Sequence, residues 1–372
     1  MTNQIKPIAI YLPQFHPIPE NDLWWGKGFT EWTNVCKATP RFKGHYQPHL
    51  PSDLGFYDLR LEETRLAQES LAKEYGIHGF CYYHYWFNSK KMLQEPIERK
   101  LKNPKEDFPF MLCWANENWT KAWDGQDKEV LMFQDYNEED DIKHMNYLCD
   151  TFFKDSRYIR HDGKPVFIVY RPKLFKNINK TLENWRSIAR QKGIGDLHLG
   201  YMQSFDFTED PHVLGFDFAV EFQPKFDLTP RSTNELINLY FKLKRKLKTR
   251  KKRNDEDKII DFKKFTETQI KNNFKTNVSP ALTPMWDNSA RRKKNAYIFT
   301  NSTPEIYGNW LSHIVKNYPW SKNKEKFLFI NAWNEWAEGN HLEPCQKWGL
   351  QYLEATKKIL NNKLQIINHP NI

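Results

Sequence analysis

The sequence predicts an α/β protein built as a single (β/α)8 TIM barrel. Eight short apolar segments recur along the 372 residues, amphipathic helical patterns separate them, and no repeat, low-complexity tract or linker interrupts the chain. A closed parallel barrel needs eight strands that alternate with helices. We therefore expect one domain over residues 1–372.

The expected strands are short runs rich in apolar and aromatic residues. In chain order they are Ile8–Leu12, Gly79–Trp86, Phe108–Asn116, Pro165–Arg171, Leu197–Gln203, Phe216–Phe222, Ala281–Asp287 and Phe327–Trp333. The expected helices between and after them are Leu61–Tyr75, Met145–Phe153, Leu182–Gln191, Pro304–Lys316 and Gly349–Leu360.

Two long loop insertions interrupt this alternation, Pro13–Asp58 after the first strand and Gln223–Val278 after the sixth. Long ordered loops in compact enzymes usually line the site. The first carries candidate ligand-binding residues, and a packed loop with aromatic anchors explains each of them equally well. These candidates are His16, Glu31 and Trp32.

In the second insertion we expect a basic helix within about residues 233–275, because apolar residues recur there at helical spacing. Its stretch Lys242–Arg253 holds nine basic residues and no acidic one. The default interpretation is a solvated charged helix. The alternative is a basic amphipathic helix that contacts an anionic membrane surface or holds a diphosphate-linked substrate.

That stretch supplies most of the net charge of +10, which arises from 56 basic and 46 acidic residues. The remainder is nearly neutral, so the charge does not predict a nucleic-acid-binding surface. We also expect no signal peptide and no membrane-spanning helix. Five widely spaced cysteines without a CxxC pair are typical of reduced thiols, and no zinc-ligand spacing is present, so we expect a cytoplasmic protein without metal or cofactor.

The most informative motif follows the last expected strand, where Glu335 and Glu338 stand three residues apart. The adjacent Trp333 and Asn334 are candidate substrate-binding residues. Carboxylates at the carboxyl end of a barrel strand occupy the position where such folds carry their chemistry. Glycosidic bond cleavage uses one carboxyl group to protonate the leaving oxygen and another as nucleophile or base. Solvated loop charges are the alternative.

Polar and aromatic residues also gather at the other expected strand ends. These substrate-binding candidates are Tyr83, His84, Tyr85, Trp86, Trp114, Asn116, Glu117, Trp119, Tyr170, Gln203, Glu221, Gln223 and Trp286. In a strand Tyr83 and Tyr85 share one face and His84 and Trp86 the other, so only one set faces the barrel axis. Glu117 is a third carboxylate or an ion-pair partner. Together these residues favour a carbohydrate-binding cleft.

Five sequence blocks carry a resemblance to a known family. They are Ile10–His16, Gly28–Thr33, Gly79–Phe87, Trp114–Trp119 and Asn331–Pro344. Through them the chain resembles the WbsX-like proteins of bacterial surface-polysaccharide gene clusters, which are similar to the family 99 glycoside hydrolases, the endo-α-mannosidases. The resemblance covers residues 7 to 365 and implies a (β/α)8 barrel with Glu335 and Glu338 as its catalytic pair.

The resemblance further implies that the substrate's own 2-hydroxyl is the nucleophile and gives an anhydro-sugar intermediate. Glu335 would assist that hydroxyl as base, and Glu338 would act as acid and then as base. Ala337 stands where the hydrolases often have His, so the subsite contacts differ. The implied substrate is an oligosaccharide or polysaccharide of O-antigen, lipopolysaccharide or capsule metabolism, free or lipid-linked.

The WbsX name also carries the label glycosyltransferase, so a nucleotide-sugar-dependent transferase is the alternative enzyme class. Such enzymes usually have a doubly wound sheet and often a DxD-type metal site. Here Glu139-Asp140-Asp141 is better interpreted as a helix start. A non-catalytic glycan-binding barrel is the third hypothesis.

Overall fold

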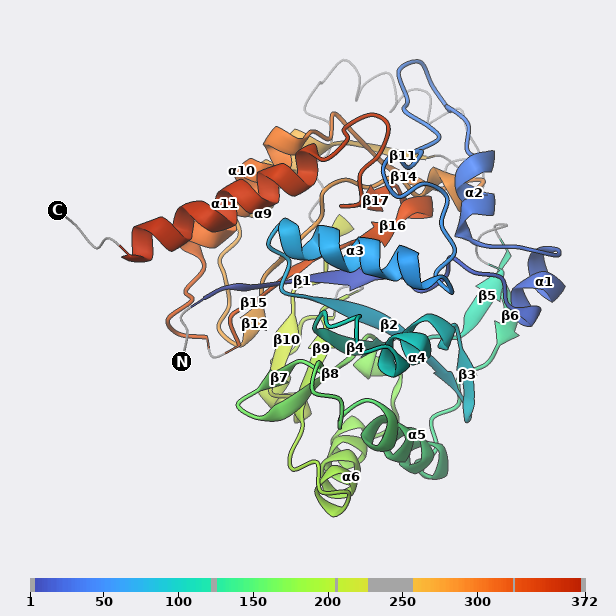
Figure 1. The fold of residues 1–372 in the computed structure, drawn as a ribbon, viewed down its shortest axis with the longest axis vertical. Helices are drawn as coiled ribbons and strands as arrows, with labels where there is room; N and C mark the ends of the chain where they lie inside the picture. Colours follow the sequence, from blue (N-terminus) through green and yellow to red (C-terminus); the bar gives the residue numbers. More distant parts are fainter. Residues whose placement is uncertain (1–3, 122–125, 205–206, 227–256, 324, 369–372) are drawn as a thin grey trace, which may run out of the picture.

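The structure is a computed structural model that describes residues 4–121, 126–204, 207–226, 257–323 and 325–368. Its centre is a closed barrel of parallel strands with helices outside it (Figure 1). In chain order the barrel strands are β1 (Lys6–Tyr11), β2 (Gly79–Phe87), β4 (Phe110–Trp114), β8 (Lys164–Val169), β9 (His198–Met202), β10 (Phe218–Val220), β12 (Val278–Ser279), β13 (Ala281–Leu282) and β15 (Phe327–Ile330). The predicted TIM barrel is confirmed.

The barrel closes through a seventh strand that is split at Pro280. Its first half, β12, pairs with β10, and its second half, β13, pairs with β15. Proline has no backbone N–H and cannot donate to a ladder, which explains the break. The Pro280 carbonyl still accepts from the Phe329 N–H at 2.9 Å. Thus β12 and β13 together act as the seventh strand in chain order and complete the ring of eight.

The predicted bounds of this seventh strand were wrong. It begins three residues before Ala281 and ends at Leu282. Trp286 and Asp287 leave the barrel and pair with β14 (Tyr297–Thr300), where the Phe299 N–H donates to the Trp286 carbonyl at 2.8 Å. The predicted run Ala281–Asp287 therefore contributes to two sheets. The periodicity of its apolar residues does not show where one sheet ends and the other begins.

All five predicted helices are present. They are α3 (Glu62–Glu74), α5 (Glu138–Thr151), α6 (Ile178–Gln191), α10 (Pro304–Asn317) and α11 (Gln351–Asn368). Helix α5 begins earlier than predicted, because Asn137 caps it by accepting from the Asp140 N–H at 2.9 Å. The acidic run Glu139-Asp140-Asp141 is thus a helix start. The helix α4 (Glu95–Lys102) follows β2, and a 3₁₀ helix, η3 (Pro211–Leu214), lies in the described part of the β9–β10 connection.

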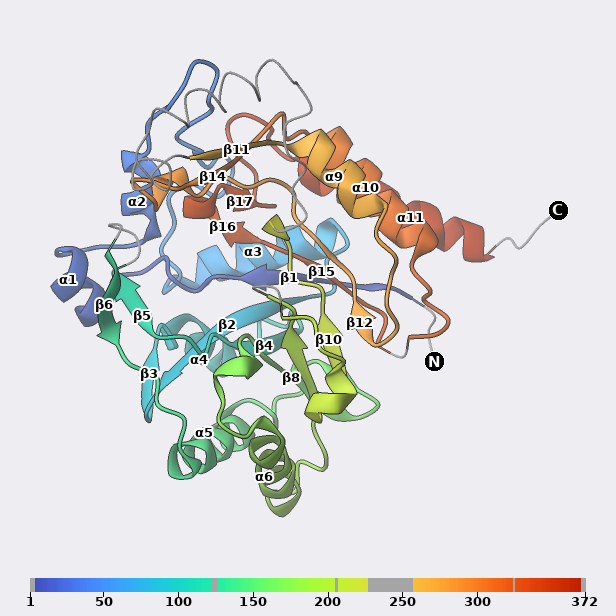
Figure 2. The same cartoon turned by 180° about the vertical axis from the view of Figure 1, so that it is seen from behind.

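Short elements decorate the two ends of the barrel. The hairpin strands are β3 (Lys90–Met92) on β2, β5 (Trp119–Lys121) with β6 (Gln126–Met132), β7 (Arg160–His161) on β8, and β16 (Asn334–Glu335) with β17 (Asn340–His341). Figure 2 shows β16 and β17 on the same side of the barrel as the pair formed by β11 (Lys258–Asp261) and β14.

The two predicted insertions differ in how much of them the structure describes. The loop after β1 contains α1 (Pro19–Trp25) and α2 (Glu31–Lys37). In the insertion after β10, residues 227–256 and with them Lys242–Arg253 lie outside the described residues. The rest is not wholly helical as expected, because β11 (Lys258–Asp261) pairs with β14 before α9 (Phe262–Ile270) begins.

Among the helices that the structure describes, none combines the length and apolarity needed to cross a membrane. The five cysteines, which all fall within the described ranges, are free thiols, and only Cys36 is exposed.

Candidate active site

The two glutamates predicted to be catalytic lie on a tight turn after β15. Glu335 ends β16, and Glu338 ends the 3₁₀ helix η6 (Trp336–Glu338). The next residue, Gly339, has φ +54°, and a Cβ there would lie 2.9 Å from the Cβ of Asp287. Only glycine satisfies both the left-handed backbone and this close approach. The Asp287 N–H donates to the Glu338 carbonyl at 2.6 Å, which fixes the turn.

Arg291 joins the two glutamates to a third, Glu31. Its Nη2 lies 2.8 Å from Glu335 Oε2 and 3.1 Å from Glu31 Oε2, and its Nη1 lies 2.9 Å from Glu338 Oε1. We call these four residues the carboxylate–arginine cluster. The planar guanidinium offers several fixed donors, which suits it to hold three carboxylates at set positions.

Burial and charge set the protonation of this cluster. Burial raises the pKa of Glu335 to about 8, and the negative charges of Glu338 and Glu31 add to that rise while Arg291 opposes it. Burial likewise raises the pKa of Glu31 above its usual range against the opposing charge of Arg291. One cation faces three carboxyl groups, so a proton is retained among them near neutral pH.

The cluster is graded in its access to solvent. The side chain of Glu31 is fully buried, that of Glu335 is 7% exposed, and that of Glu338 is 22% exposed. Glu338 is therefore the carboxyl group best placed to meet a leaving group that enters from solvent, and Glu335 lies deeper.

The strand β2 resolves the register that the sequence left open. Its residues Tyr83 and Tyr85 share one face of the strand, and the charge of Glu335 adds to the increase that burial causes in the pKa of both phenols. The Tyr83 ring lies 6.1 Å from Tyr170, and the Tyr85 ring lies 5.2 Å from Trp119. These four predicted residues therefore form an aromatic wall beside the glutamates, of the kind that packs against sugar rings.

Three other candidates lie on the outer side of the barrel wall. His84 Nε2 is 2.9 Å from His144 Nε2 of α5, and the Trp86 indole donates to Asp140 Oδ2 at 2.9 Å. Trp114 packs against the same His144, with ring centroids 4.6 Å apart. The structure does not bring these three to the cluster, because their strand positions point toward α5.

The end of β4 combines a structural amide with a charged pair. Asn116 accepts from the Arg171 N–H at 2.7 Å and donates to the Arg171 carbonyl at 2.9 Å, so it fastens β4 to the end of β8. Glu117 forms an ion pair with Arg171, as the alternative interpretation of this carboxylate anticipated. Burial raises the pKa of Glu117, and Arg171 opposes that rise.

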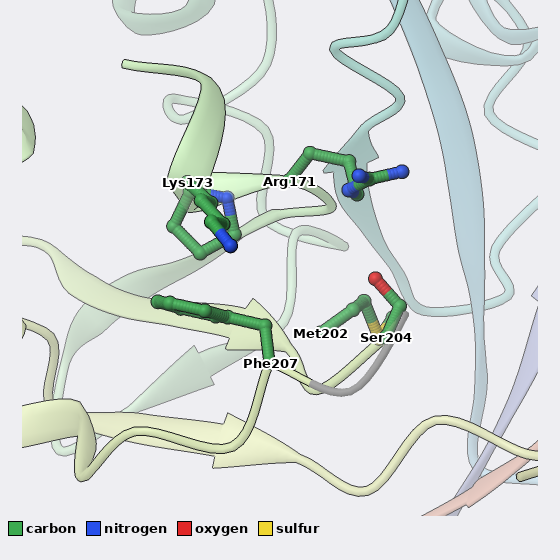
Figure 3. Close-up of a pocket in the computed structure, with 6 residues that line it drawn as sticks. Arg171, Lys173, Met202, Ser204 and Phe207 are labelled. Carbon is green, nitrogen blue, oxygen red and sulfur yellow. The ribbon is translucent and has the colours of Figure 1, made fainter. Parts of the chain in front are cut away.

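A small pocket opens next to this ion pair, at the carboxyl ends of β8 and β9 (Figure 3). Its lining combines cationic, polar and apolar side chains: Arg171, Pro172, Lys173, Met202, Ser204 and Phe207. The negative charges of Glu117 and Glu338 add to the increase that burial causes in the pKa of Tyr170, the residue before Arg171. This pocket therefore lies on the same face of the barrel as the cluster.

The tryptophans and the amide around the catalytic pair have packing roles. Trp333 is buried against Phe80 at 5.0 Å, and Asn334 hydrogen-bonds both the N–H and the carbonyl of Leu12, at 2.7 and 3.0 Å. Trp32 lies 5.5 Å from Trp336 and donates to a backbone carbonyl. These residues support the turn rather than face the aromatic wall.

The remaining candidates are dispersed. Burial lowers the pKa of His16 to about 4. The charged groups that also influence this pKa are Glu95, Asp58 and Arg60, none of which belongs to the carboxylate–arginine cluster. Gln203 donates to the Tyr201 hydroxyl at 3.4 Å, and Gln223 donates to Gln269 at 3.2 Å. Glu221 pairs with Lys225 at 2.7 Å, and Trp286 packs on Phe226 at 5.5 Å. No described contact joins these residues to the catalytic pair.

Sequence reasoning missed Arg291 and Glu343. Arg291 begins a run of four basic residues that is indistinguishable from a solvated charge run. Glu343 is buried, accepts from the Trp336 indole at 2.6 Å and from the Tyr57 hydroxyl at 2.8 Å, and burial raises its pKa to about 7. Its hydrogen bond thus fixes Trp336, which directly follows Glu335 in the sequence.

Comparisons with known proteins agree on family and fold. A sequence model described as "Glycosyltransferase WbsX" matches residues 7–356. Two uncharacterized proteins named WxcX, from two strains of Xanthomonas campestris pv. campestris, are 40% identical over 360 residues, which is 95% of this chain and 49% of theirs. The chain thus spans about half the length of these curated relatives.

Solved structures show the same barrel at low identity. A glycoside hydrolase-like protein matches with a TM-score of 0.58 and 12% identity over 96% of this chain and 94% of its own. The GH99 endo-alpha-mannosidase from Bacteroides thetaiotaomicron matches with a TM-score of 0.58 and 12% identity over 99% of this chain and 100% of its own. At this identity the likeness is one of fold.

Proposed function

Because this chain belongs to the WbsX glycosyltransferase family, we propose that it is a glycan-active enzyme that cleaves or transfers glycosidic bonds in polysaccharide metabolism. The observation that carries the proposal is the placement of Glu335 and Glu338 on one guanidinium at the carboxyl end of a (β/α)8 barrel. Two carboxyl groups of different access to solvent, beside an aromatic wall, suit acid–base chemistry at a sugar.

The proposed chemistry is retaining and endo-acting, and it proceeds in two steps. In the first, Glu335 accepts the proton of the substrate's 2-hydroxyl as that oxygen attacks the anomeric carbon, and Glu338 donates its proton to the departing glycosidic oxygen. In the second, Glu338 takes a proton from water or an acceptor hydroxyl that attacks the same carbon, and Glu335 returns its proton to the 2-oxygen. Water gives hydrolysis and a sugar hydroxyl gives transglycosylation.

The cluster supports this division of roles. A pKa of about 8 makes Glu335 a stronger base than an ordinary carboxylate, and it lies near the pH at which both its forms are populated. Glu338 is the more exposed of the pair and can reach the leaving oxygen. Arg291 keeps both carboxyl groups oriented before the substrate arrives.

The proposed substrate is a repeat of a bacterial surface polysaccharide, O-antigen or capsule, or its lipid-linked precursor. The aromatic wall of Tyr83, Tyr85, Trp119 and Tyr170 would pack on its sugar rings, and the pocket at Arg171 and Lys173 would receive a neighbouring unit. A cytoplasmic location, peripheral at the inner face of the membrane, fits a role in assembly better than one in degradation.

The family description favours a second candidate, a nucleotide-sugar-dependent glycosyltransferase of lipopolysaccharide biosynthesis. A glycan-binding barrel without catalysis is the third. One experiment distinguishes these three hypotheses. Purified protein is incubated with candidate oligosaccharides, with and without nucleotide sugars, and the products are analysed by mass spectrometry. We expect new oligosaccharides without a nucleotide sugar. Turnover that depends strictly on a nucleotide sugar would establish the second candidate instead, and binding without turnover the third.

The basic stretch Lys242–Arg253 is proposed to hold the enzyme at an anionic membrane surface. We expect cosedimentation with vesicles that contain anionic phospholipid, and loss of this binding at high salt, because the screening length falls from about 10 Å at 0.1 M to about 3 Å at 1 M. The K251Q/K252Q/R253Q variant is expected to bind more weakly. Equal binding to neutral and anionic vesicles would exclude this role.

A further inference from the structure

A second group of polar side chains lies at the end of the barrel opposite to Glu335. His161 belongs to β7 just before β8, His198 is the first residue of β9, and Glu325 lies two residues before β15. We call these three residues the floor cluster. They stand at the amino ends of barrel strands, whereas the carboxylate–arginine cluster stands at the carboxyl ends, so the two groups are separate.

The geometry of the floor cluster is that of potential metal ligands. One ligand atom from each residue lies within 4.8 Å of the others. His198 Nε2 is 3.2 Å from Glu325 Oε1, and the rings of His161 and His198 are 4.4 Å apart. The side chains of His198 and Glu325 are 7% and 8% exposed. The His198 ring is also fixed in place, because it stacks on Phe218 at 4.9 Å and 8°.

A second observation points to a missing ligand. His198 Nε2 is buried and has no hydrogen bond of acceptable geometry, although a carboxylate oxygen is close to it. Buried polar atoms without a partner are rare because they lose their hydration without replacement. A cation bound between His198 and Glu325 would satisfy this nitrogen.

The charges around the floor cluster also favour a cation. Besides Glu325, the carboxylates of Asp162 and Asp217 lie 3.4 Å from His161 Nε2 and 3.9 Å from His198 Nδ1. Lys6 is the cation that acts on His161. Asp217 is also paired with Arg186 at 2.8 Å, so the carboxylates of Glu325 and Asp162 against the charge of Lys6 leave the neighbourhood negative.

We propose that the floor cluster binds a divalent transition-metal ion, with Zn²⁺ as the best match, and that this ion stabilises the base of the barrel. Two imidazoles and one carboxylate form a ligand set that zinc accepts with water in the fourth position. The strands β9 and β15 are not neighbours in the barrel, so the ion would link segments across its floor. Sequence spacing did not reveal the site because its ligands come from three distant segments.

The test uses the full chain after treatment with a chelator. Zn²⁺ is titrated by calorimetry, Co²⁺ by its visible absorption, and the melting temperature is measured with and without Zn²⁺. We expect one ion per chain and an increase in melting temperature of about 2 to 5 °C at saturating metal. The Co²⁺ spectrum reports coordination directly, independently of any effect of a substitution on folding.

His161→Gln is the informative variant, because His161 is the most exposed of the three and its loss perturbs packing least. We expect its Zn²⁺ affinity to fall by about 100-fold or more, since it removes a direct ligand. Glu325→Gln should behave alike, and His212→Gln, at an exposed histidine in η3, should bind as the wild type does. Absence of binding by the wild type, or binding that His161→Gln leaves unchanged, would overturn the proposal.

Discussion

Replacement of Glu335 or Glu338 by glutamine is expected to lower kcat by about 10²- to 10⁴-fold, the usual contribution of a positioned acid or base. Glutamine keeps the shape of the side chain and its contact with Arg291 but cannot transfer a proton. The measurement is turnover of the oligosaccharide identified in the product assay. Glu183→Gln, at an exposed position of α6, is the matched control and should retain full activity.

Loss of activity in Glu335→Gln should not reflect unfolding. The pKa of Glu335 is raised from its usual 4.5 to about 8 in the folded protein, so its protonated form favours the fold and this contribution is lost as pH rises from 4.5 toward 8. Glutamine cannot ionise. We therefore expect Glu335→Gln to melt at or above the wild-type temperature at pH 8 to 9, and a large decrease would contradict an unfavourable burial of the ionised Glu335 carboxylate.

The pH profile of kcat/KM then assigns the roles of the pair. If Glu335 is the base and Glu338 keeps its proton over this interval, activity of the free enzyme rises as pH increases through about 8, because the ionised form of Glu335 is required. If Glu335 is instead the acid, activity falls over the same interval. A rising profile that Glu335→Gln abolishes would support the proposed assignment.

Replacement of Arg291 by methionine is expected to cause the largest loss of stability, about 3 to 5 kcal/mol in the free energy of unfolding. Methionine fills similar space but leaves three carboxyl groups without their shared cation. The pKa values of Glu335 and Glu31 should rise further, so the loss should be greater at pH 8 than at pH 6. Urea unfolding at both pH values measures this.

The neighbouring Arg292→Met variant is the control, because the described contacts of Arg292 are made by its backbone, the carbonyl with Arg41 and the N–H with Asn288. Arg291→Lys should fall between the wild type and Arg291→Met, since lysine keeps the charge but not the planar set of donors. If Arg291→Met unfolds at the wild-type urea concentration, the ion pairs of the cluster do not contribute to stability.

Most of the barrel follows from local patterns. Each predicted strand overlaps an observed one because parallel barrel strands are buried on both faces and leave continuous apolar runs. The seventh strand was misplaced because Pro280 splits it and Trp286 continues the apolar run into another sheet. The predicted range of α5 began too late, at Met145, because the first turn of the helix is acidic and lacks apolar periodicity, although the acidic run itself was interpreted as a helix start.

Fewer features of the candidate site than of the barrel could be predicted from local sequence patterns. Glu335 and Glu338 stand in one local motif, and the motif alone identifies them as candidates. Arg291 meets them only through tertiary folding, and the three residues that follow it in the sequence are basic. The orientation of Tyr83 and His84 depends on which face of β2 meets the barrel axis, and a period of two permits both answers.

Asp287 connects the turn that carries Glu338 to the segment that carries Arg291. Its N–H binds the Glu338 carbonyl, and its carboxylate starts the 3₁₀ helix η5 (Asn288–Ala290) that leads directly to Arg291. His45 and Gln47 from the first insertion hold the same carboxylate at 2.6 and 2.7 Å. Glu338, the proposed proton donor, and its countercharge Arg291 are thus both connected to Asp287. Movement of the surrounding loops would therefore displace them together without changing the distance between them.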